Sequence, residues 1–297
     1  MPLISVVMPA RNASATLEQS LQSLAEQSLR DFELVLVDDG SSDGTAELAR
    51  SFACKLSLRL VEHEQSQGVA RSINDGLAAS DSEFVARLDA DDLAHPDRLT
   101  QQVMLLRQQP RVSVCGSHML VFDNASGPTQ PRGMLAHPTH SAAIRTALLQ
   151  RCAISHPSVM CRRSVFDLVG VYDPNFDFAE DYELWCRASL LGAQFANIDA
   201  PLTSYRRHAG QVSQQKGQLQ YERDLSIKAR YMGAFLDGES PGQLPQFLAL
   251  QTRYPNRETA LSVMQQCSTA MMRLANKAPD ANEYARLVAT TLQRHLA

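Results

Sequence analysis

Three aspartates end a short apolar run at residues 84–92, which read FVARLDADD. Such a run predicts a buried strand, and the carboxylates of Asp89, Asp91 and Asp92 follow at its C-terminal end, the edge where open α/β sheets bind ligands. Three anions this close repel one another, and oxygen ligands suit a hard divalent cation such as Mg²⁺ or Mn²⁺. The pattern therefore indicates a divalent-cation site, with a solvated acidic turn before a helix as the alternative.

A second acidic pair, Asp38 and Asp39, follows an apolar run at residues 32–37 and precedes a glycine turn. At a strand end the carboxylate of Asp39 can point into the same crevice and accept a hydrogen bond from an imide N–H, the group that uracil and thymine carry. An Asp-Gly turn with a helix cap at Ser42 or Asp43 explains the same residues structurally. The two interpretations are compatible, because the same residues can do both.

A third acidic pair is Glu180 and Asp181, where a helix is predicted to start because Leu184, Trp185 and Ala188 continue at helical spacing. One carboxylate can act as a general base if it lies within hydrogen-bond reach of the hydroxyl that loses its proton. Repulsion between the two neighbours can raise a pKa. The alternative is that Asp181 caps the N-terminus of the helix.

Composition, cysteine spacing and the absence of long apolar runs argue against several classes of protein. The 297 residues carry a formal net charge of -4 and no lysine or arginine block, so nucleic-acid binding is not expected. Six cysteines form no CxxC pair, which argues against a zinc site or a disulfide framework and points to a reducing cytoplasm. The N-terminus lacks a basic region and is interrupted by Pro9, so no signal peptide is expected. No apolar run approaches the roughly 20 residues that span a bilayer, so membrane contact would be peripheral.

In the first hundred residues, predicted strands and helices alternate, and they position the acidic residues at strand ends. The expected strands lie at residues 3–8, 32–37 and 58–61 and in the run that starts at 84. Helical spacing follows the first three of them, at residues 17–25, 45–52 and 74–79. This alternation predicts an α/β fold with a doubly wound, mostly parallel sheet.

The pattern changes after residue 97. The expected elements are a helix at 97–108, a strand at 112–122, a loop at 123–138, a helix at 141–150 and a short strand at 156–160. From residue 218 the chain is expected to be mostly helical, with breaks at Pro241, Pro245, Pro255 and Pro279. An apolar stripe at helical spacing there indicates a core or dimer face, with a membrane-surface helix as the alternative. Its members are Leu261, Met264, Met271, Leu274 and Ala275.

Together these residues resemble glycosyltransferase family 2, the inverting nucleotide-sugar transferases of GT-A fold. The resemblance covers about residues 3 to 215 and rests on five motifs in the family's order. They are SVVMPARN at 5–12, VDDGSSDGT at 37–45, LDADD at 88–92, ED at 180–181 and YRRH at 205–208. It implies a GT-A domain at 1–215, with a nucleotide-binding half at about 1–110 and an acceptor half at about 111–215, followed by a helical C-terminal extension at 216–297.

On the donor side, the resemblance implies that Asp91 is the metal-binding carboxylate of the DxD motif, that Asp89 contacts the ribose or the metal shell, and that Asp92 supports them. It also implies that Asp39 reads the base imide and that Asp38 orients the loop. The other residues expected at the nucleotide are Pro9, Ala10, Arg11, Arg71 and Ala90. Many relatives have an aromatic residue where this chain has Arg11, and a guanidinium plane can also stack on a base.

On the acceptor side, Asp181 matches the family's catalytic base, and Glu180 is its neighbour. His208 matches a histidine that approaches the metal or the diphosphate, and Arg206 and Arg207 precede it with guanidinium groups that can bind phosphate. His156 lies in a stretch that lines the acceptor side in relatives. A histidine of the core or of a turn is an equally good interpretation of His156.

The sequence therefore predicts an inverting glycosyltransferase that uses Mn²⁺ or Mg²⁺ and moves a sugar from a UDP-linked donor to a hydroxyl of a glycan or lipid-linked acceptor. The resemblance places it in bacterial surface polysaccharide assembly, in the cytoplasm or peripheral at the inner face of the membrane, with a homodimer through the C-terminal helices as one arrangement. A catalytically silent nucleotide-sugar-binding protein is one alternative. A nucleotidyltransferase is another, although residues 9–12 lack the glycine-rich basic loop of that class.

Overall fold

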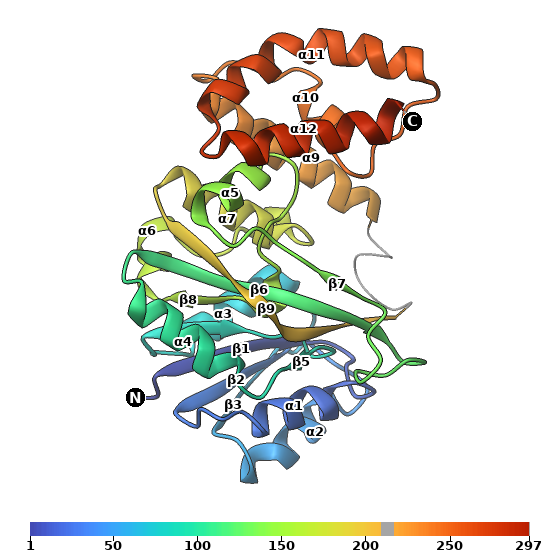
Figure 1. Ribbon diagram of the computed structural model, residues 1–297. Helices are drawn as coiled ribbons and strands as arrows, with labels where there is room; N and C mark the ends of the chain where they lie inside the picture. Colours follow the sequence, from blue (N-terminus) through green and yellow to red (C-terminus); the bar gives the residue numbers. More distant parts are fainter. Residues whose placement is uncertain (209–216, 297) are drawn as a thin grey trace.

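The first four strands form the parallel half of one mixed sheet in the computed structural model, which describes residues 1–208 and 217–296 (Figure 1). They are β1 (Ile4–Ala10), β2 (Phe32–Asp38), β3 (Leu58–Glu62) and β4 (Phe84–Arg87), in the order β3-β2-β1-β4. Helices α1 (Leu17–Ala25), α2 (Thr45–Ser51) and α3 (Val69–Ala78) connect them, with a short 3₁₀ turn η1 at Phe52–Cys54. Parallel pairing brings the C-terminal ends of β1, β2 and β4 to one edge of the sheet.

The second half of the sheet is mixed. Antiparallel β8 (Met160–Arg162) joins β4 to β6 (Val112–Asp123), which runs parallel to β9 (Gln194–Arg207). The two-residue strand β5 (Leu93–Ala94) pairs with β9, and β7 (Gly133–Leu135) pairs with β6. The α/β fold class and the mostly parallel first half are confirmed, whereas a short strand over residues 156–160 was wrong. Residues His156–Ser158 form a 3₁₀ turn, η2, because Pro157 has no main-chain N–H for strand pairing.

The remaining helices cover the sheet and form a cap beyond it. Helices α4 (Arg98–Gln108), α5 (Ser141–Ala147), α6 (Ser164–Val169) and α7 (Glu180–Leu190) belong to the second half, with the 3₁₀ turn η3 at Pro174–Phe176. Four helices then lie at one end of the molecule, beyond α5 and α7 (Figure 1): α9 (Gly217–Phe235), α10 (Leu244–Leu248), α11 (Arg257–Lys277) and α12 (Ala281–Leu296). The predicted breaks at Pro241, Pro255 and Pro279 are confirmed, whereas the break at Pro245 was wrong: Pro245 lies in the first turn of α10, where a helix tolerates proline because the N–H groups there have no partner within the helix. Among the described residues, no helix is both long and apolar enough to cross a membrane.

Two apolar clusters fill the two faces of the sheet. Neighbouring residues of β1 separate between them, since Val7 belongs to one cluster and Val6 and Met8 to the other. The cluster that contains Val7 also includes Trp185 of α7 and Leu274 of α11. The C-terminal helices therefore share a core with the helix that carries the Glu180-Asp181 pair. Of the apolar stripe predicted on α11, Leu274 lies in this core and Met264 and Met271 pack against it, whereas Leu261 and Ala275 are exposed.

Helix α3 lies close against the sheet at Gly76. A Cβ at this position would lie 2.5 Å from Cγ1 of Val7 and 3.3 Å from Cγ2 of Val37. Both neighbours are fully buried β-branched side chains with little freedom to move. The close approach of helix and sheet therefore requires a residue without a side chain.

We predict that Gly76→Ala lowers the free energy of unfolding by about 1–2 kcal/mol, because overpacking outweighs the gain in helix propensity. The matched control is Gly233→Ala in α9, where the added Cβ meets only the carbonyl oxygen of Glu239 at 3.5 Å. The control should be neutral or stabilise by up to about 1 kcal/mol. Urea unfolding midpoints measure both. A midpoint for Gly76→Ala at or above that of the wild type would contradict the packing argument.

Candidate active site

The acidic cluster lies directly after β4. Side-chain oxygens of Asp89, Asp91 and Asp92 lie within 4.8 Å of one another. Asp92 is fully buried, whereas the side chains of Asp89 and Asp91 are 32% and 27% exposed. Two carboxylates therefore face the solvent side of the cluster, and the third lies behind them.

Asp92 is the most constrained of the three carboxylates. Its Oδ1 accepts a hydrogen bond of 2.9 Å from the main-chain N–H of Arg206, whereas its buried Oδ2 has no hydrogen-bond partner within residues 1–208 and 217–296. Burial, with the charges of Asp91 and Asp89, raises the pKa of Asp92 well above its usual range. Oxygen donors this close, one of them without a partner, fit a hard divalent cation.

Two basic side chains lie against the acidic cluster. The guanidinium of Arg87 lies 2.6 Å from Oδ1 of Asp89, and Nε2 of His208 lies 2.9 Å from Oδ2 of Asp91. Burial and the charge of Asp89 nevertheless raise the pKa of Asp91. Sequence reasoning missed Arg87. A basic residue inside an apolar strand, two positions before an acid and so on the same strand face, was the available signal.

Arg206 and Arg207 differ in environment. The Arg206 guanidinium is buried and donates to the carbonyl oxygen of Asp91 (2.8 Å), to Gln19 (2.6 Å) and to Asn124 (2.9 Å). It also lies over the Phe122 ring at 4.6 Å. Arg206 therefore braces the loop that carries the acidic cluster. Arg207 is exposed at the end of β9.

The residues expected around the base gather at the ends of β1 and β2. The N–H of Asp39 donates to the carbonyl oxygen of Ala10 (2.8 Å), the last residue of β1 after Pro9, and Arg11 follows as an exposed side chain. Asp38 accepts a hydrogen bond from the N–H of Ser41 at 3.2 Å.

The other two residues expected at the nucleotide lie on other elements. Arg71 is exposed on α3. The carbonyl oxygen of Ala90, after β4, accepts hydrogen bonds from the hydroxyls of Thr16 and Ser20.

Asp39 already has four donors from its own chain. His63 (2.8 Å) and the N–H of Gln67 (2.7 Å) donate to Oδ1, and the hydroxyl of Ser66 (2.7 Å) and the N–H of Gly68 (3.1 Å) donate to Oδ2. A carboxylate has about four acceptor positions, so all of them are used. In this conformation Asp39 holds the loop between β3 and α3. Recognition of a base by Asp39 stays a prediction, and it would require one of these donors to leave.

Glu180 and Asp181 are the first two residues of α7. The N-cap is Ala179, so the alternative in which Asp181 caps the helix is wrong. Oδ1 of Asp181 accepts from the N–H of Tyr182 at 2.7 Å, and Oδ2 accepts from the thiol of Cys152 at 3.5 Å. The acidic pair therefore projects from the helix start, with Asp181 half-buried and Glu180 buried.

The two carboxyl groups differ in proton affinity. Burial, followed by the charge of Asp181, raises the pKa of Glu180 to about 8. Burial raises the pKa of Asp181 to about 6, and the charges of Asp224 and Asp89 act in the same direction. Near pH 7 Glu180 therefore keeps its proton while Asp181 is mostly ionised. Two carboxyl groups with separated pKa values can take separate roles in one site.

His156 lies beside Glu180 in the interior. Its Nδ1 is 3.6 Å from Oε1 of Glu180, and its Nε2 is 3.0 Å from the hydroxyl of Tyr172. Burial lowers the pKa of His156 well below its usual range, so the imidazole is neutral. The charge of Arg87 acts on both His156 and Glu180, which links this pair to the acidic cluster.

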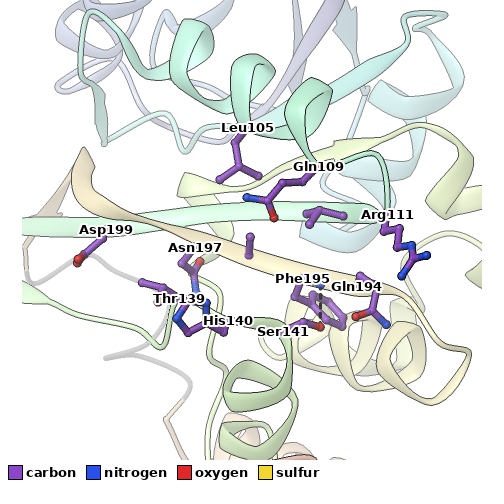
Figure 2. A pocket seen from close by; sticks show the side chains of 12 residues that line it. Leu105, Gln109, Arg111, Thr139, His140, Ser141, Gln194, Phe195, Asn197 and Asp199 are labelled. Carbon is purple, nitrogen blue, oxygen red and sulfur yellow. Dashed lines mark hydrogen bonds between the residues drawn. The ribbon is translucent and has the colours of Figure 1, made fainter.

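A pocket lies elsewhere on the surface. Figure 2 shows a pocket of about 930 Å³ lined by residues from the starts of β6 and β9, among them Arg111, Gln194 and Phe195. Gln194 begins β9 and Arg206 lies near its end, which at strand spacing separates them by about 40 Å. None of the site residues expected from the sequence lines this pocket. The candidate active site is therefore the acidic cluster after β4 and not this pocket.

Comparisons of sequence identify relatives. The family Glycosyl transferase family 2 matches residues 5–170. The bifunctional glycosyltransferase pgtA of Dictyostelium discoideum is 25% identical over 277 residues, which is 78% of this chain and 36% of pgtA. The amylovoran biosynthesis glycosyltransferase AmsE of Erwinia amylovora is 30% identical over 202 residues, which is 68% of this chain and 74% of AmsE. The chain thus spans about a third of pgtA and about three quarters of AmsE.

Comparisons of structure identify the same fold. The crystal structure of S. aureus TarS 1–349 in complex with UDP-GlcNAc matches with a TM-score of 0.63 and 18% identity, over 98% of this chain and 92% of that chain. The mannosyltransferase PcManGT from Pyrobaculum calidifontis, in complex with GDP-Man and Mn²⁺, matches with a TM-score of 0.59 and 19% identity, over 98% and 80%. Both likenesses concern the fold, which is that of GT-A glycosyltransferases.

We predict that Mn²⁺ alone raises the melting temperature of chelator-treated protein, because a cation that binds only the folded state stabilises it by about 2.7 kcal/mol at a hundred times its Kd. Asp91→Asn should remove most of this shift. The control is Asp97→Asn, an exposed carboxylate at the start of α4 outside the cluster, which should keep it. Scanning fluorimetry measures the shifts, and an equal shift in Asp91→Asn would exclude the cluster as the cation site.

Proposed function

The chain belongs to glycosyl transferase family 2, and from this premise we propose that it is an inverting, metal-dependent enzyme that moves a sugar from a UDP-linked donor to a hydroxyl of a glycan or lipid-linked acceptor. The observation that carries the proposal is the cluster of three aspartate carboxylates directly after β4, in a chain whose helix α7 begins with the acidic pair Glu180 and Asp181. We further propose that residues 1–110 form the nucleotide-binding half, residues 111–215 the acceptor half and residues 216–297 an extension.

The acidic cluster is the proposed site of the donor diphosphate. Asp91, with Asp89, Asp92 and His208, would hold a divalent cation, as supported by the closeness of their donor atoms. When bound, the cation supplies charge neutralisation and Lewis acidity for a departing diphosphate. The chain's own part is to present these oxygens in place: Arg206 fixes the loop, and Arg87 orients Asp89. PcManGT, solved with GDP-Man and Mn²⁺, and TarS, solved with UDP-GlcNAc, share the fold that supports this assignment.

Asp181 is the proposed base. Inversion requires one displacement at the anomeric carbon, and a single ionised carboxylate within hydrogen-bond reach of the acceptor hydroxyl can take its proton. Asp181 meets the charge requirement near pH 7, because its pKa of about 6 leaves it mostly ionised. Glu180 keeps its proton beside the neutral imidazole of His156, so it adds no second negative charge near the base.

The setting proposed for this activity is polysaccharide assembly. AmsE is named for amylovoran biosynthesis, and this chain is 30% identical to it over 202 residues. A glycan hydroxyl is therefore the acceptor class that the relatives support.

We predict that a thermal-shift screen of nucleotide sugars finds a UDP-linked donor that raises the melting temperature more with Mn²⁺ than without it. Ligand and cation share the acidic cluster in this proposal, so their stabilisations should exceed the sum of the separate effects. Release of nucleoside diphosphate from the same donor should follow. Binding without any release would favour a silent binding protein, and release of pyrophosphate from a nucleoside triphosphate would favour a nucleotidyltransferase.

A second prediction concerns Asp181 and Glu180. Asp181→Asn should lower kcat by about 10²–10⁴ and leave donor affinity unchanged, because the amide cannot accept the acceptor's proton. Glu180→Gln should keep most activity near pH 7, because an amide resembles the protonated acid. The wild-type rate should fall as pH drops through about 6, where Asp181 gains its proton. Turnover of Asp181→Asn within threefold of the wild type would exclude Asp181 as the base.

A further inference from the structure

The backbone immediately before the Glu180-Asp181 pair adopts a conformation that needs support. Residues 177–179 connect η3 to α7, and Phe178 has a φ of +76°. A bulky aromatic residue rarely occupies this left-handed region, and it stays there only when surrounding contacts hold it. A rotation of Phe178 back to negative φ would change the direction from which the chain enters α7. The orientation of Asp181 therefore depends on what holds this segment.

Helix α9 supplies contacts that hold it. The Nε2 of Gln220 donates to the carbonyl oxygen of Phe178 at 2.7 Å. The guanidinium of Arg223, one turn further along α9, donates to the carbonyl oxygen of Asp177 and lies 5.5 Å from the centre of the Phe178 ring. Two consecutive carbonyl groups thus receive their hydrogen bonds from side chains of a helix more than 40 residues later in the chain.

The opposite side of the segment rests on the start of α3. Oδ1 of Asp177 accepts from the N–H of Ala70 at 2.9 Å. Gly68 allows this approach, because it has a φ of +96° and a Cβ there would lie 2.2 Å from Oδ2 of Asp177. The segment is therefore clamped between α3 on the nucleotide half and α9 of the extension.

Helix α9 also lies against α7 beyond this segment. The guanidinium of Arg230 lies 2.5 Å from Oε1 of Glu183, and the buried ammonium of Lys228 lies 5.7 Å from the centre of the Tyr182 ring. The charge of Asp224 contributes to the raised pKa of Asp181, which places this part of α9 near the proposed base. The match to the family ends at residue 170, so these contacts are supplied by a part of the chain outside it.

We propose that Gln220 and Arg223 of α9 are positioning residues for the transfer reaction, which hold residues 177–179 in the conformation that aims Asp181 at the acceptor hydroxyl. The C-terminal extension then contributes to the transfer reaction, because its helix α9 holds the segment before Asp181. This inference rests on the proposed role of Asp181 as the base. Loss of either donor leaves a carbonyl group without its hydrogen bond and allows Phe178 to relax, so the base moves while the donor site keeps its residues.

The test compares four variants. Arg223→Gln removes the charge and shortens the side chain, so its amide no longer reaches the carbonyl oxygen of Asp177, and Gln220→Glu replaces the amide donor by a carboxylate. Arg223→Lys keeps a long cationic donor, and Gln218→Ala removes a surface contact to Glu222 on the same helix. The first two should lower kcat for nucleoside diphosphate release by about 10–100-fold, since small misplacements of a reacting group have effects of this size. The Kd of the donor found in the thermal-shift screen should stay within about threefold. Arg223→Lys should recover most of the loss, and Gln218→Ala should match the wild type.

Hydrogen exchange of the peptide that covers residues 176–182 reads the clamp independently of activity. Exchange there should accelerate in Arg223→Gln and Gln220→Glu and stay unchanged in Gln218→Ala, at temperatures well below the melting temperature of each variant. Wild-type kcat in both donor-removing variants would overturn the positioning role, as would equal losses in Arg223→Gln and Arg223→Lys. If the wild type released no nucleoside diphosphate from any nucleotide sugar, the proposed function would fail, and unchanged exchange would separately overturn the clamp.

Discussion

Mutual repulsion among three carboxylates is the constraint around which this edge of the sheet is built. Oxygens of Asp89, Asp91 and Asp92 lie within 4.8 Å of one another, a separation at which two unit charges repel by about 3–4 kcal/mol at an effective dielectric constant of about 20. Solvent reduces this value for the two partly exposed side chains. Burial of Asp92 adds to the cost of charge, and both effects raise its pKa. A fold that keeps such a cluster needs cations and hydrogen-bond donors close by.

Distant segments of the chain meet this requirement together. The main-chain N–H of Arg206 donates to Asp92, and its guanidinium donates to the carbonyl oxygen of Asp91, to Gln19 of α1 and to Asn124 after β6. One residue near the end of β9 therefore ties together three other parts of the chain. The parallel pairing of β1 and β4 places the loops that follow these two strands at the same edge of the sheet.

Short-range sequence patterns were sufficient to predict much of the fold and the residue types of the site. The apolar runs of β1 to β4, the start of α7 to within one residue, and the breaks at Pro241, Pro255 and Pro279 follow from short-range propensity and spacing. Strand β9 was not predicted, because its 14 residues contain Pro201 and pair with β6 through register shifts that depend on the partner strand. The four donors to Asp39 come from 24 or more residues away, and the contacts of α9 with residues 177–178 span more than 40. Such non-local contacts leave no periodic signal in the sequence.

Anomalous diffraction at the manganese edge, from crystals grown with MnCl₂ and UDP, would locate the cation relative to the three aspartates. We expect one strong peak within bonding distance of a carboxylate oxygen of Asp91, with the diphosphate oxygens of UDP on its other side and Asp181 facing the same cavity. A nucleotide bound away from β4, with no ion between it and the three aspartates, would show that the acidic cluster is not the donor site.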